Sequence, residues 1–159
     1  MKLTNKIKLR YCPVLLLLFL IFTQLFILNG VAQGVTIYSD AEPEAVEYLQ
    51  KAVEKMEEAL ATYQGANYPG RKLWAEAIEY AEQAIAIDPD FVEAHYYLAL
   101  MFQHTNWYYR EAEQWNKYLS LIENSDKTSP QVKQNLAYAY YRLGYNAYEK
   151  GDYEQSLIY

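Results

Sequence analysis

The stretch AIEYAEQAIAIDPDFVEAHYYLA, residues 77–99, joins two amphipathic patterns across a single break. Its first half places alanines and isoleucines at helical spacing, and its second half places Val92 and Leu98 on one side of another helical pattern. Pro89 cannot continue a helix, and it disfavours helical geometry at Asp88. The break therefore predicts that one helix ends before Asp88 and that a second begins directly afterwards.

Two acidic residues after the break have the spacing of a helix start. Asp90 is of the residue type that accepts a backbone N–H bond at a helix N-cap, and Glu93 follows three residues later. That spacing is typical of a capping box, in which the two side chains satisfy the first free N–H groups. We therefore expect Asp90 to cap the second helix.

The helical periodicity continues along most of the chain, and no strand-like alternation of any length accompanies it. We expect a helix of about five turns from residue 42. Further helices are expected at about 72–87, 91–103, 108–122, 130–150 and 153–159. Short turns would join them into antiparallel pairs at about 42–89, 90–123 and 129–159. The predicted fold class is all-α.

A repeated spacing relates these pairs. Trp74 and Tyr108, which begin the second helices of two consecutive pairs, are 34 residues apart. The distance from Ala99 to Tyr108 is nine residues, and so is the distance from Gly144 to Tyr153. A period of 30-odd residues indicates a solenoid of stacked helix pairs, because one pair cannot bury its apolar face alone.

The repeat resembles the tetratricopeptide repeat (TPR) family. The matching segments read LWAEAIEYAEQAIAIDP at 73–89, LALMFQHTNWYYREAEQWNKYLSL at 98–121 and LGYNAYEKGDYEQSL at 143–157. The resemblance covers about residues 58–159 and implies a short right-handed solenoid with a ligand groove formed by the first helices of the pairs. Glu111 stands where the family has a small residue, which predicts looser or tilted stacking of the middle and last pairs.

The first 32 residues differ from the rest of the chain. A basic start precedes a nearly continuous apolar run at residues 14–28, and Gly30 and Ala32 follow as small residues. This layout is typical of a secretory signal cleaved after Ala32, the alternatives being an uncleaved N-terminal membrane anchor or a buried core helix. Residues 33–41 would form an extended lead-in. The chain is expected to be exported, to the periplasm or the extracellular face of the envelope, with membrane contact only through residues 14–28 if uncleaved.

Charge and cysteine usage narrow the possible partners. Residues 1–32 hold four of the 14 basic residues and none of the 20 acidic residues, so cleavage leaves a net charge of about −10. This field repels phosphate backbones, and nucleic acid is therefore not an expected partner. The lone Cys12 precedes the apolar run, so it would leave with the signal, and the remaining chain would have no thiol chemistry.

The sequence indicates no catalytic centre. His95 and His104 are nine residues apart, which does not place them together on one helix face at metal-binding spacing. Nucleotide-binding glycine loops, nucleophile elbows and other catalytic motifs are missing from the sequence. We therefore expect a noncatalytic protein that uses no metal and no cofactor.

Tyrosine is the unusual residue, with 18 in the chain. Four of them stand at i, i+3, i+7 and i+10 on the helix at 130–150 and form one stripe. By the TPR resemblance this stripe faces the groove, and the matching positions of the helix at 91–103 are Glu93, Tyr96, Leu100, Gln103 and His104. The candidate binding residues are Tyr96, Leu100, His104, Tyr138, Tyr141, Tyr145 and Tyr148. The alternative is that the stripe packs against the helix at 108–122 or against a further repeat.

The expected function is that of an exported TPR scaffold that binds a protein or peptide segment, because tyrosine offers flat apolar area with a polar tip. One alternative is a glycan-binding aromatic surface. Another is a structural subunit that assembles with copies of itself through its C-terminal edge. The last expected helix has only about seven residues, so we also expect a truncated product of a longer repeat protein, or another chain covering that edge.

Overall fold

The computed structural model describes residue 37 and residues 39–122 and 129–159. Helix makes up 78% of this described part, which contains no strand. The helices are α2 (Pro43–Thr62), α3 (Lys72–Ile87), α4 (Val92–His104), α5 (Tyr108–Ile122), α6 (Pro130–Glu149) and α7 (Tyr153–Ile158). The all-α prediction is confirmed, and the helix bounds agree with the expected ranges to within one residue.

The predicted signal or anchor, residues 1–32, lies outside the described residues, as does most of the lead-in at 33–41. Among the helices that the structure describes, none combines the length and the apolar character needed to cross a membrane.

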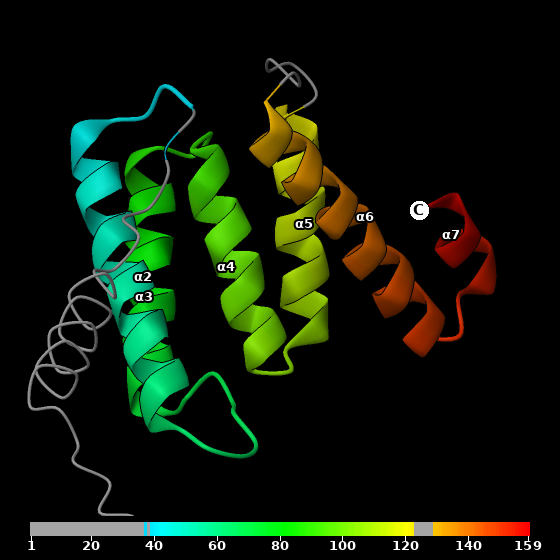
Figure 1. Ribbon diagram of the computed structural model, residues 1–159, viewed down its shortest axis with the longest axis horizontal. Helices are drawn as coiled ribbons and strands as arrows, with labels where there is room; N and C mark the ends of the chain where they lie inside the picture. The colour runs from blue at the N-terminus through cyan, green and yellow to red at the C-terminus, as the bar shows by residue number, and fades with distance from the viewer. Residues whose placement is uncertain (1–36, 38, 123–128) are drawn as a thin grey trace, which may run out of the picture. The chain divides into compact units, whose positions relative to one another are not determined.

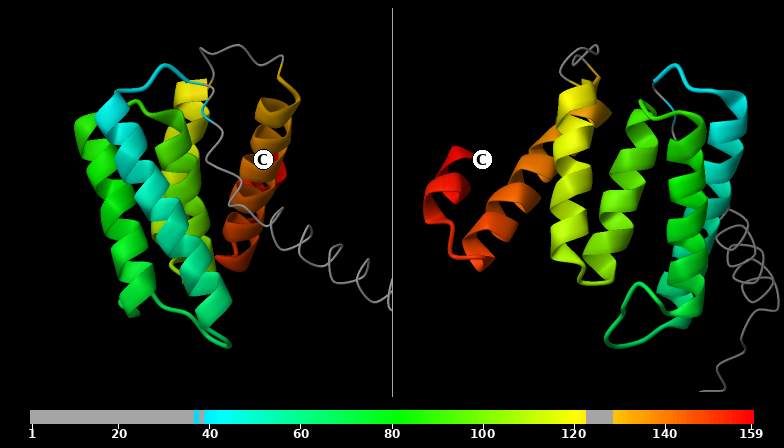
Figure 2. Two further views of the ribbon diagram at one scale, coloured as in Figure 1. Left: turned by 60° about the vertical axis from the view of Figure 1, so that its left-hand side comes forward. Right: turned by 180° about the vertical axis from the view of Figure 1, so that it is seen from behind.

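The six helices pack in pairs. Each pair consists of consecutive antiparallel helices: α2 with α3, α4 with α5, and α6 with α7 (Figures 1 and 2). Contacts between α3 and α4 and between α5 and α6 join the pairs in chain order. The helices therefore follow one another in space as they do in sequence.

The break at Asp88-Pro89 ends α3 as the sequence predicts. The Asp88 carboxylate accepts one hydrogen bond from the Asp90 backbone N–H, at 3.1 Å, and another from the Glu42 backbone N–H, at 3.3 Å. The first of these bonds shapes the turn as an Asx turn. The second ties the turn to the beginning of α2, so Asp88 fixes the break against the first helix.

The predicted capping box is wrong. Phe91, not Asp90, is the residue directly before α4, and it makes no side-chain cap. Its ring is fully buried, and Asp90 therefore lies one residue too early to cap the helix. Asp90 Oδ1 instead accepts a hydrogen bond from Lys117 Nζ on α5, at 3.1 Å. Glu93 is buried, and its carboxylate accepts hydrogen bonds from the Ser39 backbone N–H and hydroxyl. The two acidic residues thus hold other parts of the chain against α4 rather than capping it.

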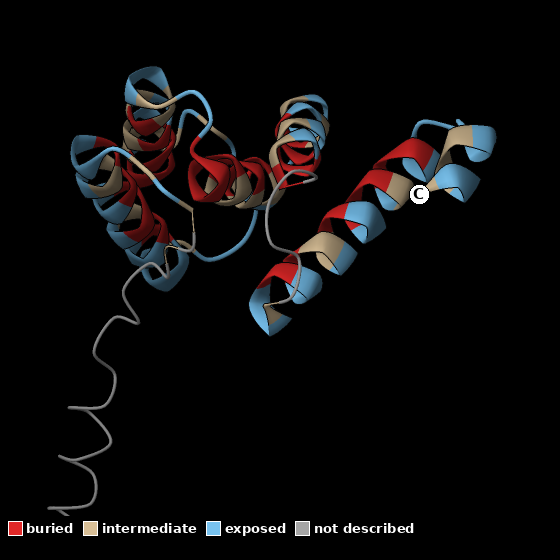
Figure 3. Cartoon of the chain, turned by 90° about the horizontal axis from the view of Figure 1, so that it is seen from above, coloured by how far each residue is buried: buried red, intermediate tan, exposed pale blue. Residues whose placement is uncertain are grey.

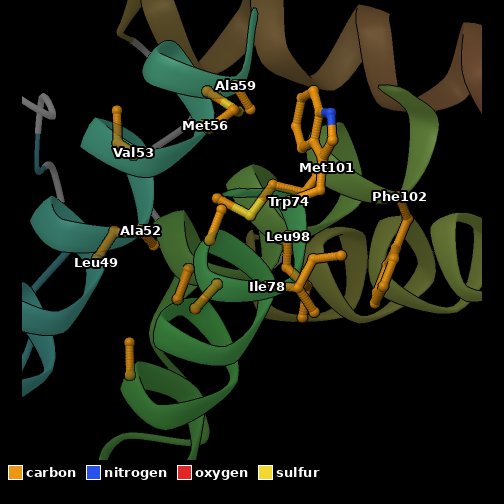
Figure 4. Packing of buried hydrophobic residues seen from close by; sticks show 14 of the residues in the cluster. Leu49, Ala52, Val53, Met56, Ala59, Trp74, Ile78, Leu98, Met101 and Phe102 are labelled. Carbon is orange, nitrogen blue, oxygen red and sulfur yellow. The ribbon is translucent and has the colours of Figure 1, made fainter. Parts of the chain in front are cut away.

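A first hydrophobic cluster lies between α2, α3 and α4 (Figure 4). Ala77, Ala81 and Ala84 are fully buried along α3. Their small side chains allow neighbouring helices to approach closely, and larger side chains such as Trp74 and Phe102 fill the remaining space at the density of a protein interior. The alanines of the opening stretch are therefore contact positions of the core.

A second cluster lies between α4, α5 and α6, so α4 contributes to both clusters. Leu98 and Phe102 belong to the first cluster, and Val92 and Ala99 to the second. A helix that is apolar on all sides is buried on all sides, and eight of the 13 residues of α4 are buried. This helix is consequently the shared wall between the two halves of the core.

The turn from α6 to α7 has the geometry of a Schellman motif. Gly151 has a positive φ of 78°, its N–H bonds to the Tyr148 carbonyl at 2.9 Å, and the Asp152 N–H bonds to the Ala147 carbonyl at 2.9 Å. Asp152 then caps α7 by accepting from the Gln155 N–H at 3.1 Å. No residue of α7 is buried, whereas α6 buries one side (Figure 3).

We expect Leu49→Ala on α2 to lower the free energy of unfolding by about 2–5 kcal/mol, because it leaves a cavity in the first cluster. Leu49 is 0% exposed, whereas Leu60 on the same helix is 44% exposed. Leu60→Ala is therefore the matched control, and we expect it to change stability by less than about 0.5 kcal/mol. Urea unfolding followed by far-UV circular dichroism measures both, and equal effects would contradict the packing described.

Candidate functional site

The tyrosine stripe on α6 divides into a packed part and an exposed part. Tyr141, Tyr145 and Tyr148 are 61%, 39% and 58% exposed, and we call these three residues the tyrosine face. The ring centroids of Tyr141 and Tyr145 lie 6.4 Å apart with the rings tilted by 34°. Three large aromatic side chains therefore remain open to solvent along one side of α6.

Tyr138 belongs to the packed part. Its ring centroid lies 5.8 Å from that of Trp115 on α5, and its hydroxyl donates to Gln103 Oε1 on α4 at 2.9 Å. The ring centroid of Tyr96 lies 5.4 Å from the same indole. These two candidate residues thus sit in an aromatic cluster that joins three helices, as the packing alternative predicts for the stripe.

The remaining candidate residues on α4 also have packing partners. Leu100 is partly buried against both hydrophobic clusters. His104 stacks on Trp74 of α3 with ring centroids 5.5 Å apart and an angle of 20° between the planes. Of the candidates on α4, only His104 keeps an exposed side chain.

A buried ion pair beneath the tyrosine face connects α5 to α6. Arg142 Nε donates to Glu111 Oε1 at 2.7 Å and Arg142 Nη2 donates to Glu111 Oε2 at 2.9 Å. The same Glu111 Oε1 accepts from Trp115 Nε1 at 3.0 Å. Glu111 is fully buried and Arg142 nearly so, and the bidentate geometry is the strongest that these two groups form.

Arg142 of the ion pair also contacts the tyrosine face. Burial by itself lowers the pKa of Arg142, but the hydrogen bond and the charge of Glu111 outweigh it, so that the pKa is raised above the usual value. The fixed guanidinium carbon lies 5.1 Å from the centroid of the Tyr145 ring. A cation in this position attracts the face of an aromatic ring, and it therefore holds Tyr145 in place.

An open hollow of about 310 Å³ lies beside the tyrosine face, between α6 and α7. All three residues of the face line it, together with Tyr140, Gly144, Ser156 and Tyr159. A Cβ atom at Gly144 would lie 3.5 Å from the Ser156 carbonyl oxygen, an ordinary contact, so α7 runs close to α6 at this point. The hollow has a wall of tyrosine rings on α6 and a rim formed by α7.

The electrostatics of the face depend on nearby acidic residues. The pKa of Tyr145 is raised, chiefly by the negative charge of Glu149, one turn further along α6. The phenol therefore stays protonated at neutral pH, and its hydroxyl is available as a hydrogen-bond donor.

Within the described residues no group of three histidine, cysteine, aspartate or glutamate side chains is placed to hold a metal ion. His95 is buried, with Nδ1 at 2.8 Å from Gln114 Oε1 and Nε2 at 3.1 Å from the Pro89 carbonyl oxygen. Nδ1 thus joins α4 to α5, and Nε2 joins α4 to the turn that precedes it.

Sequence reasoning missed the ion pair and part of the hollow. In the sequence, Glu111 stands out only as a departure from the repeat pattern. An acidic residue at a position where the pattern has a small, buried residue is itself a signal that a buried cation faces it. At the position where looser or tilted stacking is predicted, the pair joins α5 to α6 at short distances, and α6 is inclined to α5 (Figure 1). Tyr140 and Tyr159 were missed because their exposure depends on how α7 lies.

Comparison of the chain with protein-family models, with curated proteins and with solved structures finds no match.

Breaking the ion pair on one side is expected to destabilise the fold by about 3–5 kcal/mol, because Glu111→Gln or Arg142→Met leaves one buried charge without its partner. The double variant Glu111→Gln/Arg142→Met is expected to recover at least half of that loss, since it buries no charge. Urea unfolding gives the four free energies of the cycle.

The exposed pair Arg110–Glu113, with 3.1 Å between Nη1 and Oε2, is the control for this cycle. Its coupling energy is expected to stay below about 1 kcal/mol, as for other surface pairs. A coupling between Glu111 and Arg142 no larger than that of the surface pair would refute the role given to the buried one.

His104 is expected to titrate below the ordinary histidine pKa of about 6.5. Partial burial is the largest cause of the lowered pKa and the positive charge of Arg142 the second, with Glu111 acting in the opposite direction. The unfolded chain then binds more protons than the folded one, so the contribution of His104 to stability is full above pH 6.5 and is lost as the pH falls toward the folded pKa. An NMR titration of the imidazole, assigned with His104→Gln, measures the value, and a pKa of 6.5 or higher would contradict the geometry.

Proposed function

We propose that the chain is an exported, noncatalytic scaffold of the TPR type that captures a protein or peptide segment on the tyrosine face. The observation that supports this most directly is the row of three exposed tyrosine rings beside an open hollow of about 310 Å³. Exposed aromatic groups gathered at a concave place are typical of binding sites rather than of scattered surface residues.

The tyrosine face is suited to recognition because it is held in position before binding. Tyr141 lies between the rings of Tyr138 and Tyr145, at 6.2 and 6.4 Å, and Tyr138 is itself packed against α5. Arg142 holds the Tyr145 ring from the other side. Rigid aromatic side chains lose little conformational entropy on binding, which favours affinity.

The negative charge near the tyrosine face indicates which partner segments can bind there. Glu149 lies close enough to raise the pKa of Tyr145, and the chain without residues 1–32 has a net charge of about −10. An acidic segment would be repelled from the face, whereas apolar and aromatic side chains, or lysine and arginine over the rings, would be attracted. We therefore expect a neutral or basic partner segment.

A self-assembling subunit is the second candidate, because α7 exposes large apolar side chains. Leu157 is 89% and Ile158 74% exposed, and neither contributes to a hydrophobic cluster. A glycan that stacks on the tyrosine rings would use the same face as a peptide, and an experiment has to distinguish the two ligands.

We expect the double variant Tyr141→Ala/Tyr145→Ala to lower the capture of specific partners from an envelope extract by at least about tenfold, because tyrosine is enriched among the few interface residues whose truncation costs about 2 kcal/mol or more. The matched control is Tyr68→Ala/Tyr109→Ala, which removes two exposed tyrosines from other elements. Quantitative mass spectrometry of captured proteins compares the two, with helicity checked by circular dichroism.

Equal capture by both double variants would contradict the proposal. Signal on a glycan array that disappears with Tyr141→Ala/Tyr145→Ala would instead assign the face to sugars. Light scattering that shows a dimer for the wild type and a monomer for Leu157→Glu/Ile158→Glu would favour the self-assembling subunit.

A further inference from the structure

Asn146 on α6 is a buried carboxamide with unused hydrogen-bonding capacity. The residue is 2% exposed, and neither its Nδ2 nor its Oδ1 has a hydrogen-bond partner among the described residues. A carboxamide can donate two hydrogen bonds and accept two, and leaving such a group buried and unpaired is costly. Buried polar side chains without a protein partner are rare in native proteins, and a bound ligand or an ordered water can satisfy them.

The carboxamide lines a pocket of about 150 Å³ that is separate from the tyrosine face. Three helices and one turn form it. The lining residues besides Asn146 and Tyr159 are Ala112 and Asn116 from α5, Leu143 and Ala147 from α6, Lys150 and Asp152 from the turn after α6, and Gln155 from α7. Tyr159 is the one residue that lines both this pocket and the hollow beside the tyrosine face. A cavity of this volume accommodates a molecule of roughly six non-hydrogen atoms, the size of benzene.

Three of the polar residues that line the pocket with Asn146, namely Asn116, Asp152 and Tyr159, take part in hydrogen bonds with one another or with the backbone. Asn116 Nδ2 donates to the Ala112 carbonyl at 2.9 Å, and Asn116 Oδ1 accepts from the Tyr159 hydroxyl at 3.4 Å. Asp152 Oδ1 accepts from the Gln155 backbone N–H as the cap of α7. These groups hold the walls of the pocket, and the capacity of Asn146 remains for whatever enters it.

We propose that this pocket binds a primary carboxamide group, either at the end of a glutamine side chain or on a small free amide. A carboxamide can donate to Asn146 Oδ1 and accept from Asn146 Nδ2 at the same time, so that each group satisfies the other. The methylene groups next to it contact the apolar wall of Ala112, Leu143 and Ala147. This site does not depend on the function proposed for the tyrosine face.

Other chemical groups of the same size fit less well. A carboxylate could accept from Asn146 Nδ2 and meet the positive charge of Lys150 on the lining, but it has no donor for Asn146 Oδ1 and would also lie close to the negative charge of Asp152. A ketone satisfies Nδ2 and leaves Oδ1 unpaired. A site built to bond both a donor and an acceptor discriminates strongly against an analogue that lacks one of them, because its own polar group is then left unpaired.

Propionamide, the analogue of a glutamine side chain, is the first probe. Titrated into the full-length ¹⁵N-labelled chain in detergent micelles, it is expected to shift the side-chain amide signals of Asn146 in a saturable way. Butanone and propionate, which have the same number of non-hydrogen atoms, are expected to bind at least tenfold more weakly. Equal responses to the three molecules, or no saturable response to propionamide, would overturn the proposal and leave ordered water as the occupant.

Two further ligands distinguish the sources of the amide. Free L-glutamine tests a small-molecule ligand, and an acetyl-Ala-Gln-Ala N-methylamide peptide tests a glutamine side chain of a polypeptide. The source is the one that binds more tightly than propionamide. If the affinities of L-glutamine and of the peptide are both more than tenfold weaker than that of propionamide, neither source is the ligand of the pocket and the proposal is wrong.

Asn146→Leu is the matching variant, since it replaces the carboxamide by an apolar side chain of similar size. It is expected to abolish propionamide binding while the melting temperature stays level or rises, because a buried unpaired polar group is removed. Tyr141→Ala/Tyr145→Ala is the control and is expected to bind propionamide as the wild type does. Unchanged propionamide binding by Asn146→Leu would overturn the proposal, and the comparison of propionamide with butanone on the wild type decides it if the variant fails to fold.

Discussion

Arg142 extends from α6 toward α5 and forms two hydrogen bonds with the fully buried carboxylate of Glu111. Glu111 is fully buried and Arg142 nearly so, so each charge requires the other, and the position of α6 is constrained by that requirement. The tyrosine face depends on it because the same guanidinium lies under the Tyr145 ring. The hollow and the Asn146 pocket depend on it as well, since both are bounded by α6 and by α7, which packs on α6.

The ion pair joins two of the three helices that form the second hydrophobic cluster, and that cluster shares α4 with the first. Helix α4 contributes to both hydrophobic clusters, and Trp115, whose indole donates to Glu111, packs between Tyr96 of α4 and Tyr138 of α6. Polar pairing and aromatic packing thus act on the same three helices. The ion pair and the aromatic packing bury one side of α6, and the remaining, exposed side carries the tyrosine face.

Local signals in the sequence were sufficient for the helices and their order. The proline at 89 and the Gly151-Asp152 turn act within a few residues, so they could be read without knowing the fold. Asp90 failed as a cap because Phe91 is drawn into the core and shifts the start of α4, which is a tertiary effect. The stripe of tyrosines was visible, but its division into packed and exposed members depends on where α5 and α7 lie. Asn146 gives no sequence signal at all, because an asparagine in a helix is ordinary until its burial is known.

The Glu111–Arg142 pair fixes α6 against α5, and the exchange rate of the Arg142 Nε proton reports on this contact. NMR of the full-length chain labelled with ¹⁵N at arginine follows this proton, which donates to Glu111 Oε1 at 2.7 Å. The account predicts a slowly exchanging Nε–H signal that is lost in Glu111→Gln, while amide signals of α2 and α3 keep their positions. An Arg142 Nε–H that exchanges as fast as that of free arginine would show that the pair does not fix α6 against α5.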